Sequence, residues 1–206
     1  MVGIDEVGRG ALAGPMTVGA VVLRSAATPP PGLTDSKLLS PARRRALVAP
    51  LEAWADDWSL GHVSAVEIDA WGLRLALAVA ASRALEGLST TPTIALIDGS
   101  FNLLRAPRDV RLGAEVVPAL SYQDLAVTTV VKGDRACASI AAASVLAKVC
   151  RDELMVGLSD EFAPYGWRQN KGYGAPEHLD AIRRWGPTVH HRHSWRLPVH
   201  EVAQNA

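Results

Sequence analysis

The feature that most constrains this 206-residue chain occurs three times: a short apolar segment ends in acidic residues. These acidic residues are Asp5 with Glu6, Asp98, and Asp134. The segments before them are rich in Val, Ile and Leu, which is typical of buried strands. Residues at the ends of strands in one sheet can meet at a single edge of that sheet. We therefore expect these four carboxylates to converge.

The rest of the chain alternates between helical and strand patterns. Ser40-Pro41 and the capping box Ser64-x-x-Glu67 each mark a helix start, and Gly186-Pro187 marks a helix end. This alternation predicts an α/β fold with a mixed β-sheet flanked by helices. The expected strands cover residues 2–5, 17–23, 93–97 and 127–131, and the expected helices cover residues 41–58, 64–88, 135–156 and 176–185.

The length and composition of the chain suit one domain. A chain of 206 residues can bury a full core, and 49% hydrophobic and 20% charged residues are ordinary values for a globular protein. We expect a single domain over residues 1–206. Its C-terminal helical part would begin near residue 157, and a tail would follow residue 198.

Four converging carboxylates repel one another unless a cation neutralises them. Ligand sets made only of oxygen atoms favour Mg²⁺ or Mn²⁺ over zinc. Such a site can hold two ions about 4 Å apart, one to activate an attacking water and one to stabilise the leaving oxygen of a phosphodiester. The pattern therefore predicts a metal site formed by Asp5, Glu6, Asp98 and Asp134.

Each acidic residue also has a simpler interpretation. Asp98 precedes Gly99 and suits a turn, Asp134 suits a helix cap, and Asp5-Glu6 suits an exposed strand end. The three segments together favour the metal site over these separate explanations. A further acid, Asp152, lies four residues after Lys148, and an ion pair on one helix explains it.

A glycine-rich turn from Gly8 to Pro15 follows the first acidic pair. It is a poor dinucleotide fingerprint, because a proline and a β-branched strand follow the glycines where a helix is required. A turn that lets the backbone approach a ligand explains it better. Its amides and the Arg9 guanidinium could contact a sugar hydroxyl and a phosphate. A plain tight hairpin remains the alternative.

The charges balance over the whole chain, with 21 Lys and Arg against 21 Asp and Glu. The C-terminal stretch from Trp167 to Val199 is locally basic and also holds four histidines. Such a stretch fits a surface that faces phosphates, and it fits a solvated charged face equally well. Global charge therefore does not decide whether the protein binds nucleic acid.

The two cysteines, Cys137 and Cys150, lie about 20 Å apart if one helix holds both, which is too far for a disulfide. Unpaired cysteines fit a reducing cytosol. The acids at Asp5-Glu6 interrupt any apolar signal-peptide pattern, and no uncharged stretch is long enough for a membrane span. We therefore expect a cytoplasmic protein without a membrane partner, and we expect it to be a monomer.

Several of these segments, taken together and in order, closely resemble the type 2 ribonuclease H (ribonuclease HII) family. The resemblance covers residues 3 to about 195, and the run Asp-Glu-Val-Gly-Arg-Gly is the most specific part of it. The matching segments are Gly3–Gly10, Asp35-Ser-Lys37, Leu96–Gly99, Val131–Asp134, Ser139–Val149, Arg151-Asp152, Lys171-Gly-Tyr173 and His190-His191-Arg192.

The resemblance implies a ribonuclease H-like fold and an endonuclease that cuts the RNA strand of RNA–DNA hybrids. It also implies nicking 5′ to single ribonucleotides in duplex DNA, with 3′-hydroxyl and 5′-phosphate products. Two Mn²⁺ or Mg²⁺ ions would bind the four acids already named. The implied cellular roles are ribonucleotide removal from DNA and RNA primer degradation.

The resemblance also assigns substrate-binding residues. Gly8, Arg9 and Gly10 would sense the ribose 2′-hydroxyl, and Lys37 would contact a phosphate. Tyr173 would lie against the deoxyribose on the 3′ side of an RNA–DNA junction, where a 2′-hydroxyl would crowd its ring. Type 3 relatives carry an additional N-terminal domain, and the position of Asp5 so near the start favours type 2.

Two features depart from the family pattern. Leu38 replaces the second of two lysines that commonly follow Asp-Ser, so one phosphate contact is missing or is supplied elsewhere. The stretch between Asp98 and Asp134 is longer than in many relatives. Arg105, Arg108 and Arg111 in this stretch could contact the duplex. Alternatively, the stretch is a surface loop without a role in binding, and this second interpretation is favoured.

Two other functions remain possible from the sequence. Another nuclease or strand transferase of the same fold would share the acids but lack the Gly8–Gly10 turn and Tyr173. A hybrid-binding module would share the surface but have no catalysis. A metal site formed by the C-terminal histidines is disfavoured, because the match to the family gives them a structural or phosphate-side role.

Overall fold

A five-stranded mixed sheet forms the centre of the computed structural model, which describes residues 1–24, 28–105, 122 and 125–199. The strand order is β3-β2-β1-β4-β5. β1, β2 and β3 pair in antiparallel fashion, whereas β4 and β5 run parallel to β1. The strands are β1 (Val2–Val7), β2 (Met16–Val22), β3 (Asp57–Val63), β4 (Ile94–Asp98) and β5 (Ala126–Val130).

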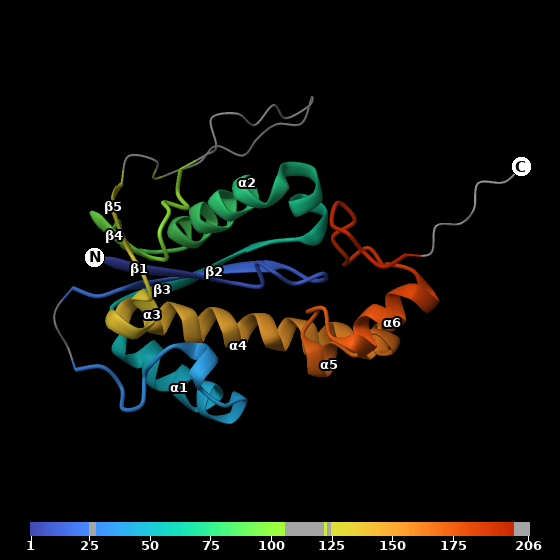
Figure 1. Cartoon of the computed structure of the whole chain (residues 1–206). Helices are drawn as coiled ribbons and strands as arrows, with labels where there is room; N and C mark the ends of the chain where they lie inside the picture. The colour runs from blue at the N-terminus through green and yellow to red at the C-terminus, as the bar shows by residue number, and fades with distance from the viewer. Residues whose placement is uncertain (25–27, 106–121, 123–124, 200–206) are drawn as a thin grey trace, which may run out of the picture.

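Helices cover both faces of this sheet. Figure 1 shows α2 on one face and α4, with α1 beyond it, on the other, while α5 and α6 lie past the end of the sheet. None of the helices in the described residues has the length and apolar character needed to cross a membrane. The helices are α1 (Pro41–Trp54), α2 (Ala65–Glu86), α3 (Gly133–Ala136), α4 (Ala138–Glu161), α5 (Trp167–Asn170) and α6 (Pro176–Trp185), with 3₁₀ turns η1 (Ser36–Leu38) and η2 (Ala163–Tyr165).

Three apolar clusters hold these layers together. The largest lies between the sheet and α2 and includes the fully buried Ile4, Ile68 and Ile97. A second joins α4 and α1 to the opposite side of the sheet, and a third surrounds Trp167 in the C-terminal part. Each fully buried side chain of this size contributes roughly 1.5–3 kcal/mol. The two faces of the sheet are therefore held by separate apolar clusters.

The long helix α4 approaches the sheet unusually closely at Gly3. A Cβ atom at Gly3 would lie 2.4 Å from the backbone carbon of Ser139 and 2.6 Å from the nitrogen of Ile140. A real Cβ atom essentially never lies this close to atoms of another segment, so any larger residue would push the helix away. Small residues on α4, such as Ala142 and Ala143, complete this close packing. The glycine thus fixes the position of α4 beside β1.

The helix starts predicted from Ser40-Pro41 and from the Ser64–Glu67 capping box are confirmed. The Ser40 hydroxyl accepts from the amide of Arg43 at the start of α1, and both halves of the capping box that begins α2 are formed. The predicted helix over 176–185 coincides with α6. The strands predicted at 2–5, 17–23, 93–97 and 127–131 correspond to β1, β2, β4 and β5, with ends that differ by one or two residues.

One strand was not predicted, and the first helix was predicted to be too long. α1 ends at Trp54, and residues expected to be helical up to residue 58 enter strand β3. β3 pairs along its whole length with β2, from Asp57 opposite Val22 to Val63 opposite Met16. This long-range pairing outweighs the local helical preference. A helix in its place would leave the outer edge of β2 unpaired.

The third predicted helix is divided in two. The chain is extended at Cys137, with φ −123° and ψ 118°, so α3 and α4 are separate helices and α4 continues to Glu161.

Cys137 and Cys150 are both free thiols, as expected. Arg108 and Arg111 lie outside the described residues, and Arg105 is exposed.

Candidate active site

Two parallel strands place the first three acids. Ile4 of β1 pairs with Ile97 of β4, and the next residues along these strands are Asp5 and Asp98. Glu6 follows Asp5 on β1, and its amide donates to the Asp5 carboxylate over 2.8 Å. Equal strand register therefore brings acids that are 93 positions apart in sequence to one edge of the sheet.

Asp134 was predicted to lie at the end of a strand, but it lies in the first turn of α3. The Asp98 carboxylate accepts from the amides of Gly133 and Asp134, at 2.7 and 3.4 Å. A carboxylate is favourable at the N-terminus of a helix because it accepts otherwise unpaired amides. Asp98 thus anchors the short helix that carries Asp134, and the fourth acid joins the other three.

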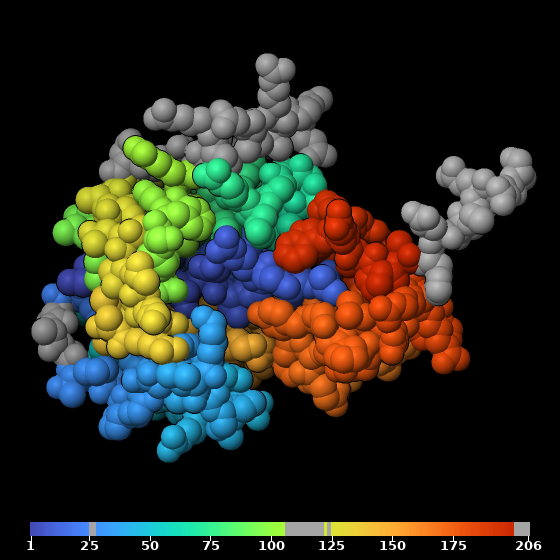
Figure 2. Space-filling view, in the orientation of Figure 1, coloured from blue at the N-terminus to red at the C-terminus, as the bar shows by residue number. Residues whose placement is uncertain are grey.

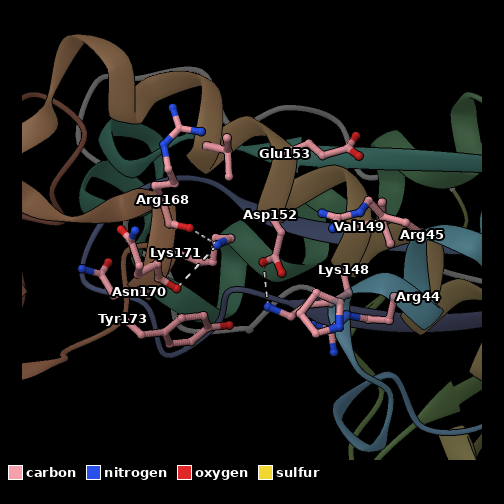
Figure 3. A pocket seen from close by; sticks show the side chains of 13 residues that line it. Arg44, Arg45, Lys148, Val149, Asp152, Glu153, Arg168, Asn170, Lys171 and Tyr173 are labelled. Atoms are coloured by element: carbon pink, nitrogen blue, oxygen red, sulfur yellow. Dashed lines mark hydrogen bonds and ion pairs between the residues drawn. The ribbon is translucent and has the colours of Figure 1, made fainter.

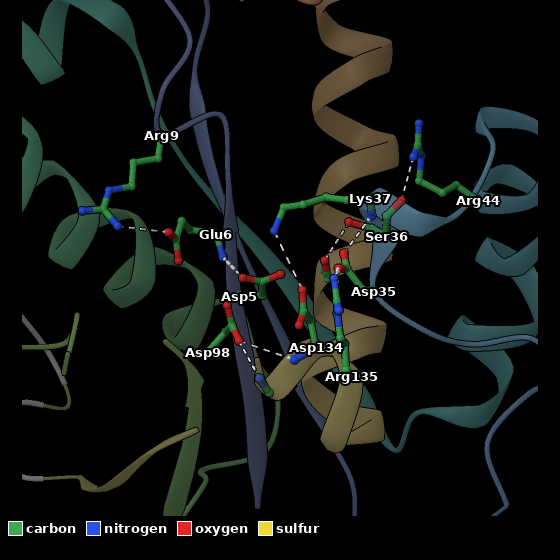
Figure 4. Close-up of polar contacts among 12 residues, drawn as sticks. Asp5, Glu6, Arg9, Asp35, Ser36, Lys37, Arg44, Asp98, Asp134 and Arg135 are labelled. Carbon is green, nitrogen blue, oxygen red and sulfur yellow. Dashed lines mark hydrogen bonds and ion pairs between the residues drawn. The ribbon is translucent and has the colours of Figure 1, made fainter. Parts of the chain in front are cut away.

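Basic residues contact this acidic group from two sides (Figure 4). Lys37 approaches Asp134 with its Nζ atom 3.8 Å from Oδ2, and Arg9 lies 3.6 Å from Glu6. A neighbouring ion pair joins Arg135 to the buried Asp35 at 3.1 Å. The sequence-predicted Lys37 and Arg9 therefore lie at the acidic edge.

The surroundings of the acidic edge raise the pKa values of three of its carboxylates. Burial, together with the charges of Glu6 and Asp98, raises the pKa of Asp5 to about 7, although a hydrogen bond with Ser144 and the Lys37 charge lower it in part. Burial is also the main cause that raises the pKa values of Glu6 and Asp134. The positive charge supplied by Lys37 and Arg9 therefore does not fully compensate these acids.

This donor set fits a hard divalent cation. Asp5 is only 3% exposed, and burial is the main cause that raises its pKa to about 7, so a nearby cation would stabilise its charged form. Carboxylate oxygens are ligands that Mg²⁺ and Mn²⁺ prefer. Within the described residues, no group of three or more His, Cys, Asp or Glu side chains is arranged so that it could hold a metal ion as it stands. The four carboxylates share one edge of the sheet, and their side chains would have to move to bind an ion together.

Two buried arginines hold the glycine-rich turn. Arg192 donates to the carbonyl oxygens of Gly8, Arg9 and Gly14, and Arg151 donates to those of Ala13, Pro15 and Lys171. Both arginines are fully buried. Figure 2 shows the consequence at the surface, where the C-terminal residues pack against the N-terminal ones. The turn is therefore fixed by tertiary contacts rather than being a plain hairpin.

The turn also requires glycine at Gly8. Its φ is +82°, and an added Cβ atom would lie 2.1 Å from Nε of Arg151. Gly10 is different, since it is exposed and a Cβ there would meet nothing within 4 Å. Gly8 is thus needed by the fold itself, whereas the open surroundings of Gly10 leave room for a ligand.

Tyr173 follows Gly172, whose carbonyl oxygen accepts from the amides of Leu12 and Ala13 in the glycine-rich turn. The Tyr173 ring is 5.2 Å from the Arg151 guanidinium carbon and 5.7 Å from Nζ of Lys148. Figure 3 shows Tyr173 on the wall of a pocket of about 590 Å³, with Lys148 and Lys171 nearby. Lys148 also pairs with Asp152 at 2.6 Å, as the sequence had indicated. Tyr173 therefore lines a basic pocket beside the glycine-rich turn.

Three residues that support the site could not be identified from the sequence. Asp35, Arg151 and Arg192 lie within segments that match the family, but the sequence gives them no role. The basic stretch from Trp167 to Val199 was expected to lie at the surface, and this is wrong for Arg192, which is fully buried. For the two arginines the only signal in the sequence is an unusual neighbourhood. Arg151 follows a segment of small residues, and Arg192 follows two histidines. Their partners are backbone carbonyls, which a sequence does not display.

The fold and acidic edge define a ribonuclease H-like protein. The ribonuclease H2 of Pyrococcus horikoshii OT3 superposes with a TM-score of 0.72 over 96% of this chain and 94% of that chain, at 24% identity. The ribonuclease HII in a PCNA complex from Archaeoglobus fulgidus gives a TM-score of 0.69 at 25% identity, over 94% and 92% of the two chains. The mixed sheet with flanking helices and a helical C-terminal part is therefore confirmed.

The sequence comparisons are more specific. The model of the family described as Ribonuclease HII matches residues 2–197. The ribonuclease HII of Streptomyces avermitilis is 46% identical over 193 residues, which are 94% of this chain and 75% of the relative. That of Cereibacter sphaeroides is 45% identical over 202 residues, covering 98% and 86%. The chain belongs to the ribonuclease HII family, the type 2 ribonucleases H.

Proposed function

We propose that this member of the ribonuclease HII family cuts the RNA strand of RNA–DNA hybrids and nicks duplex DNA 5′ to single ribonucleotides. The products carry 3′-hydroxyl and 5′-phosphate ends. The observation that carries the proposal is the convergence of Asp5, Glu6, Asp98 and Asp134 at one edge of the sheet, with incomplete positive charge around them. Removal of ribonucleotides from DNA and degradation of RNA primers are the cellular roles that fit this reaction.

The four acids would hold two divalent ions, Mn²⁺ or Mg²⁺. When bound, such ions supply activation of the attacking water and stabilisation of the leaving oxygen. The solved structure of Bst-RNase HIII in complex with Mn²⁺ has the same fold, with a TM-score of 0.63 at 19% identity. For this chain the support comes from its own donor set, four oxygen ligands whose charge is only partly balanced.

The other residues at this edge would bind and orient the substrate. Lys37 is largely exposed and beside Asp134, so it can reach a phosphate next to the one that is cut. Arg9 and the glycine backbone of the turn lie on the Glu6 side, where they can contact a ribose 2′-hydroxyl. Leu38 is 61% exposed and carries no charge. Lys37 would therefore contact the phosphate without a second lysine beside it.

Tyr173 would select the deoxyribose that follows the ribonucleotide. A ring laid flat on a sugar without a 2′-hydroxyl would crowd a sugar that has one. The DNA beyond this sugar would enter the pocket of Figure 3, where Arg45, Lys148 and Lys171 gather. Burial lowers the pKa values of Lys148 and Lys171, Asp152 raises them in part, and neighbouring cations lower them further. A phosphate there would relieve this repulsion.

A cleavage-site map on a duplex with one ribonucleotide tests the proposal. We expect one nick, 5′ to the ribonucleotide, with Mn²⁺ or Mg²⁺ and none with a chelator. The matched control is the same duplex in all-DNA form, which should stay intact. Equal cutting of the two duplexes would disprove the proposed specificity.

Substituting Asp134 separates an enzyme from a hybrid-binding module. Asp134→Asn keeps the size of the side chain and the amide that donates to Asp98. We expect it to abolish most cleavage while hybrid binding is largely retained. Unchanged cleavage would remove Asp134 from the mechanism, and absence of cleavage in the wild-type protein would favour the binding module.

A further inference from the structure

Two buried histidines lie behind Tyr173 and have no role in the reaction as proposed. His178 belongs to α6 and His191 to the segment after it, and neither is exposed to solvent. The rings of Tyr165 and Trp167 surround them at centroid distances of 5.0 to 6.3 Å. Buried polar groups of this kind must be hydrogen-bonded to be tolerated.

The partners of these histidines determine where their protons are. The carbonyl oxygen of Tyr173 can only accept, so Nδ1 of His178, 2.8 Å away, must carry a hydrogen. The amide of Thr188 can only donate, so Nδ1 of His191, 2.9 Å away, must be unprotonated. Neutral His191 therefore carries its hydrogen on Nε2, and neutral His178 has none there.

The contact between the two rings agrees with this assignment. The Nε2 atoms of His191 and His178 are 3.1 Å apart, so His191 donates and His178 accepts. The indole N–H of Trp167 also donates to Nε2 of His178, over 3.1 Å. Burial lowers the pKa of both histidines, that of His191 to about 4, which keeps them neutral. One directed chain thus runs from Thr188 through both rings to the Tyr173 carbonyl.

The end of this chain is the residue proposed to select deoxyribose. The Tyr173 carbonyl accepts from His178 and from the amide of Ala175, both over 2.8 Å. On the other side, Arg151 and Lys148 contact the ring and not the backbone. His178 thus supplies a side-chain donor to the backbone carbonyl of the residue whose ring is proposed to read the sugar.

We propose that His178, oriented by His191, is a positioning residue that holds Tyr173 where its ring can distinguish deoxyribose from ribose. This inference rests on the function proposed for Tyr173. It differs from a purely structural role because it ties these histidines to substrate selectivity. A buried histidine pair that only fills space would affect cleavage of all substrates alike.

The first test measures selectivity. The readout is the ratio of kcat/KM on a single-ribonucleotide duplex to kcat/KM on a continuous RNA–DNA hybrid. We expect His178→Leu, which has no donor for Tyr173, to lower this ratio roughly 10-fold to 100-fold. His178→Asn should retain much of it, because its amide can donate from the position of Nδ1. The loss should appear in kcat for the single-ribonucleotide duplex.

His190→Leu is the matched control. His190 packs against the same Trp167 ring, at a centroid distance of 5.9 Å, and also contacts Phe162. We expect this variant to keep the wild-type ratio. A folded His178→Leu variant with the wild-type ratio, or an equal loss in His190→Leu, would overturn the proposal.

Tyr173→Ala distinguishes failure of this inference from failure of the proposed function. If Tyr173→Ala lowers the ratio and His178→Leu does not, only the positioning role is wrong. If Tyr173→Ala leaves the ratio unchanged, Tyr173 has no selective role, and the inference is overturned with it.

The second test needs no variant and so is independent of folding defects. ¹⁵N-detected NMR of the wild-type protein reports which nitrogen of each histidine carries hydrogen. We expect the Nδ1–H form for His178 and the Nε2–H form for His191 near neutral pH. The opposite tautomer at either ring would break the chain to Tyr173 and disprove the inference.

Discussion

Asp5 and Asp98 occupy equivalent positions on neighbouring parallel strands, each directly after the paired residues Ile4 and Ile97. This relationship creates the acidic edge, because the equal register forces two charged groups together. Burial and the neighbouring charges raise the pKa of Asp5 to about 7. The repulsion between these carboxylates lowers the stability of the fold and favours the binding of a cation.

Asp98→Asn should separate catalysis from folding. The new amide oxygen can still accept from Gly133, so α3 should keep its place. Cleavage should fall roughly 100-fold or more, since loss of even an outer group behind a metal ligand costs 10–100-fold. The measurements are cleavage rate and unfolding midpoint. Asp160→Asn, at an exposed pair with Arg168, is the control and should leave cleavage unchanged.

Lys37→Met should weaken substrate binding in a salt-dependent way. Loss of one phosphate contact should reduce the slope of log Kd against log salt by about 0.9. Binding can be measured without cleavage in the Asp98→Asn background. Arg24→Met, which removes a cation that contacts Thr90, should keep the slope. An unchanged slope for Lys37→Met would argue against the phosphate contact.

Arg192→Met should destabilise the fold through the glycine-rich turn. The substitution leaves the carbonyls of Gly8, Arg9 and Gly14 without their guanidinium donor. We expect a loss of about 2–5 kcal/mol in the free energy of unfolding, measured in urea. The buried Nε of Arg192 has no partner in the described structure, which reduces the net contribution of this arginine. The exposed Arg184→Met should change stability by less than about 0.5 kcal/mol.

Acid should weaken the fold through His191. Burial lowers its pKa from 6.5 to about 4, with further lowering by His178, His193 and His190. Between these values the unfolded chain binds more protons, so this contribution to stability is complete above pH 6.5 and declines as the pH falls toward 4. Urea unfolding midpoints across this range should fall less steeply in His191→Gln than in wild type. Parallel pH profiles would contradict the assignment, and the comparison cancels the carboxylates common to both proteins.

The local patterns in the sequence were sufficient for several elements. Ser40-Pro41, the Ser64–Glu67 capping box and Pro176 correctly predicted where three helices begin, because capping depends on residues within one turn. The apolar segments before Asp5 and Asp98 likewise predicted strands that end at the acidic edge. The gathering of the four acids also followed from the sequence, although their catalytic and metal-binding roles stay a proposal.

Only the tertiary structure decided what depends on distant partners. β3 exists because β2 offers it an edge, and Asp134 reaches the site because the Asp98 carboxylate anchors α3. The sequence determined, by itself, the acidic pattern and the family resemblance, since both are carried by residue types in order. The buried role of Arg192 depends on the carbonyl oxygen of Gly8, more than 100 residues away in the sequence. That of His191 depends on the amide of Thr188, only a few residues away. In both cases the position of the backbone group is set only when the chain is packed.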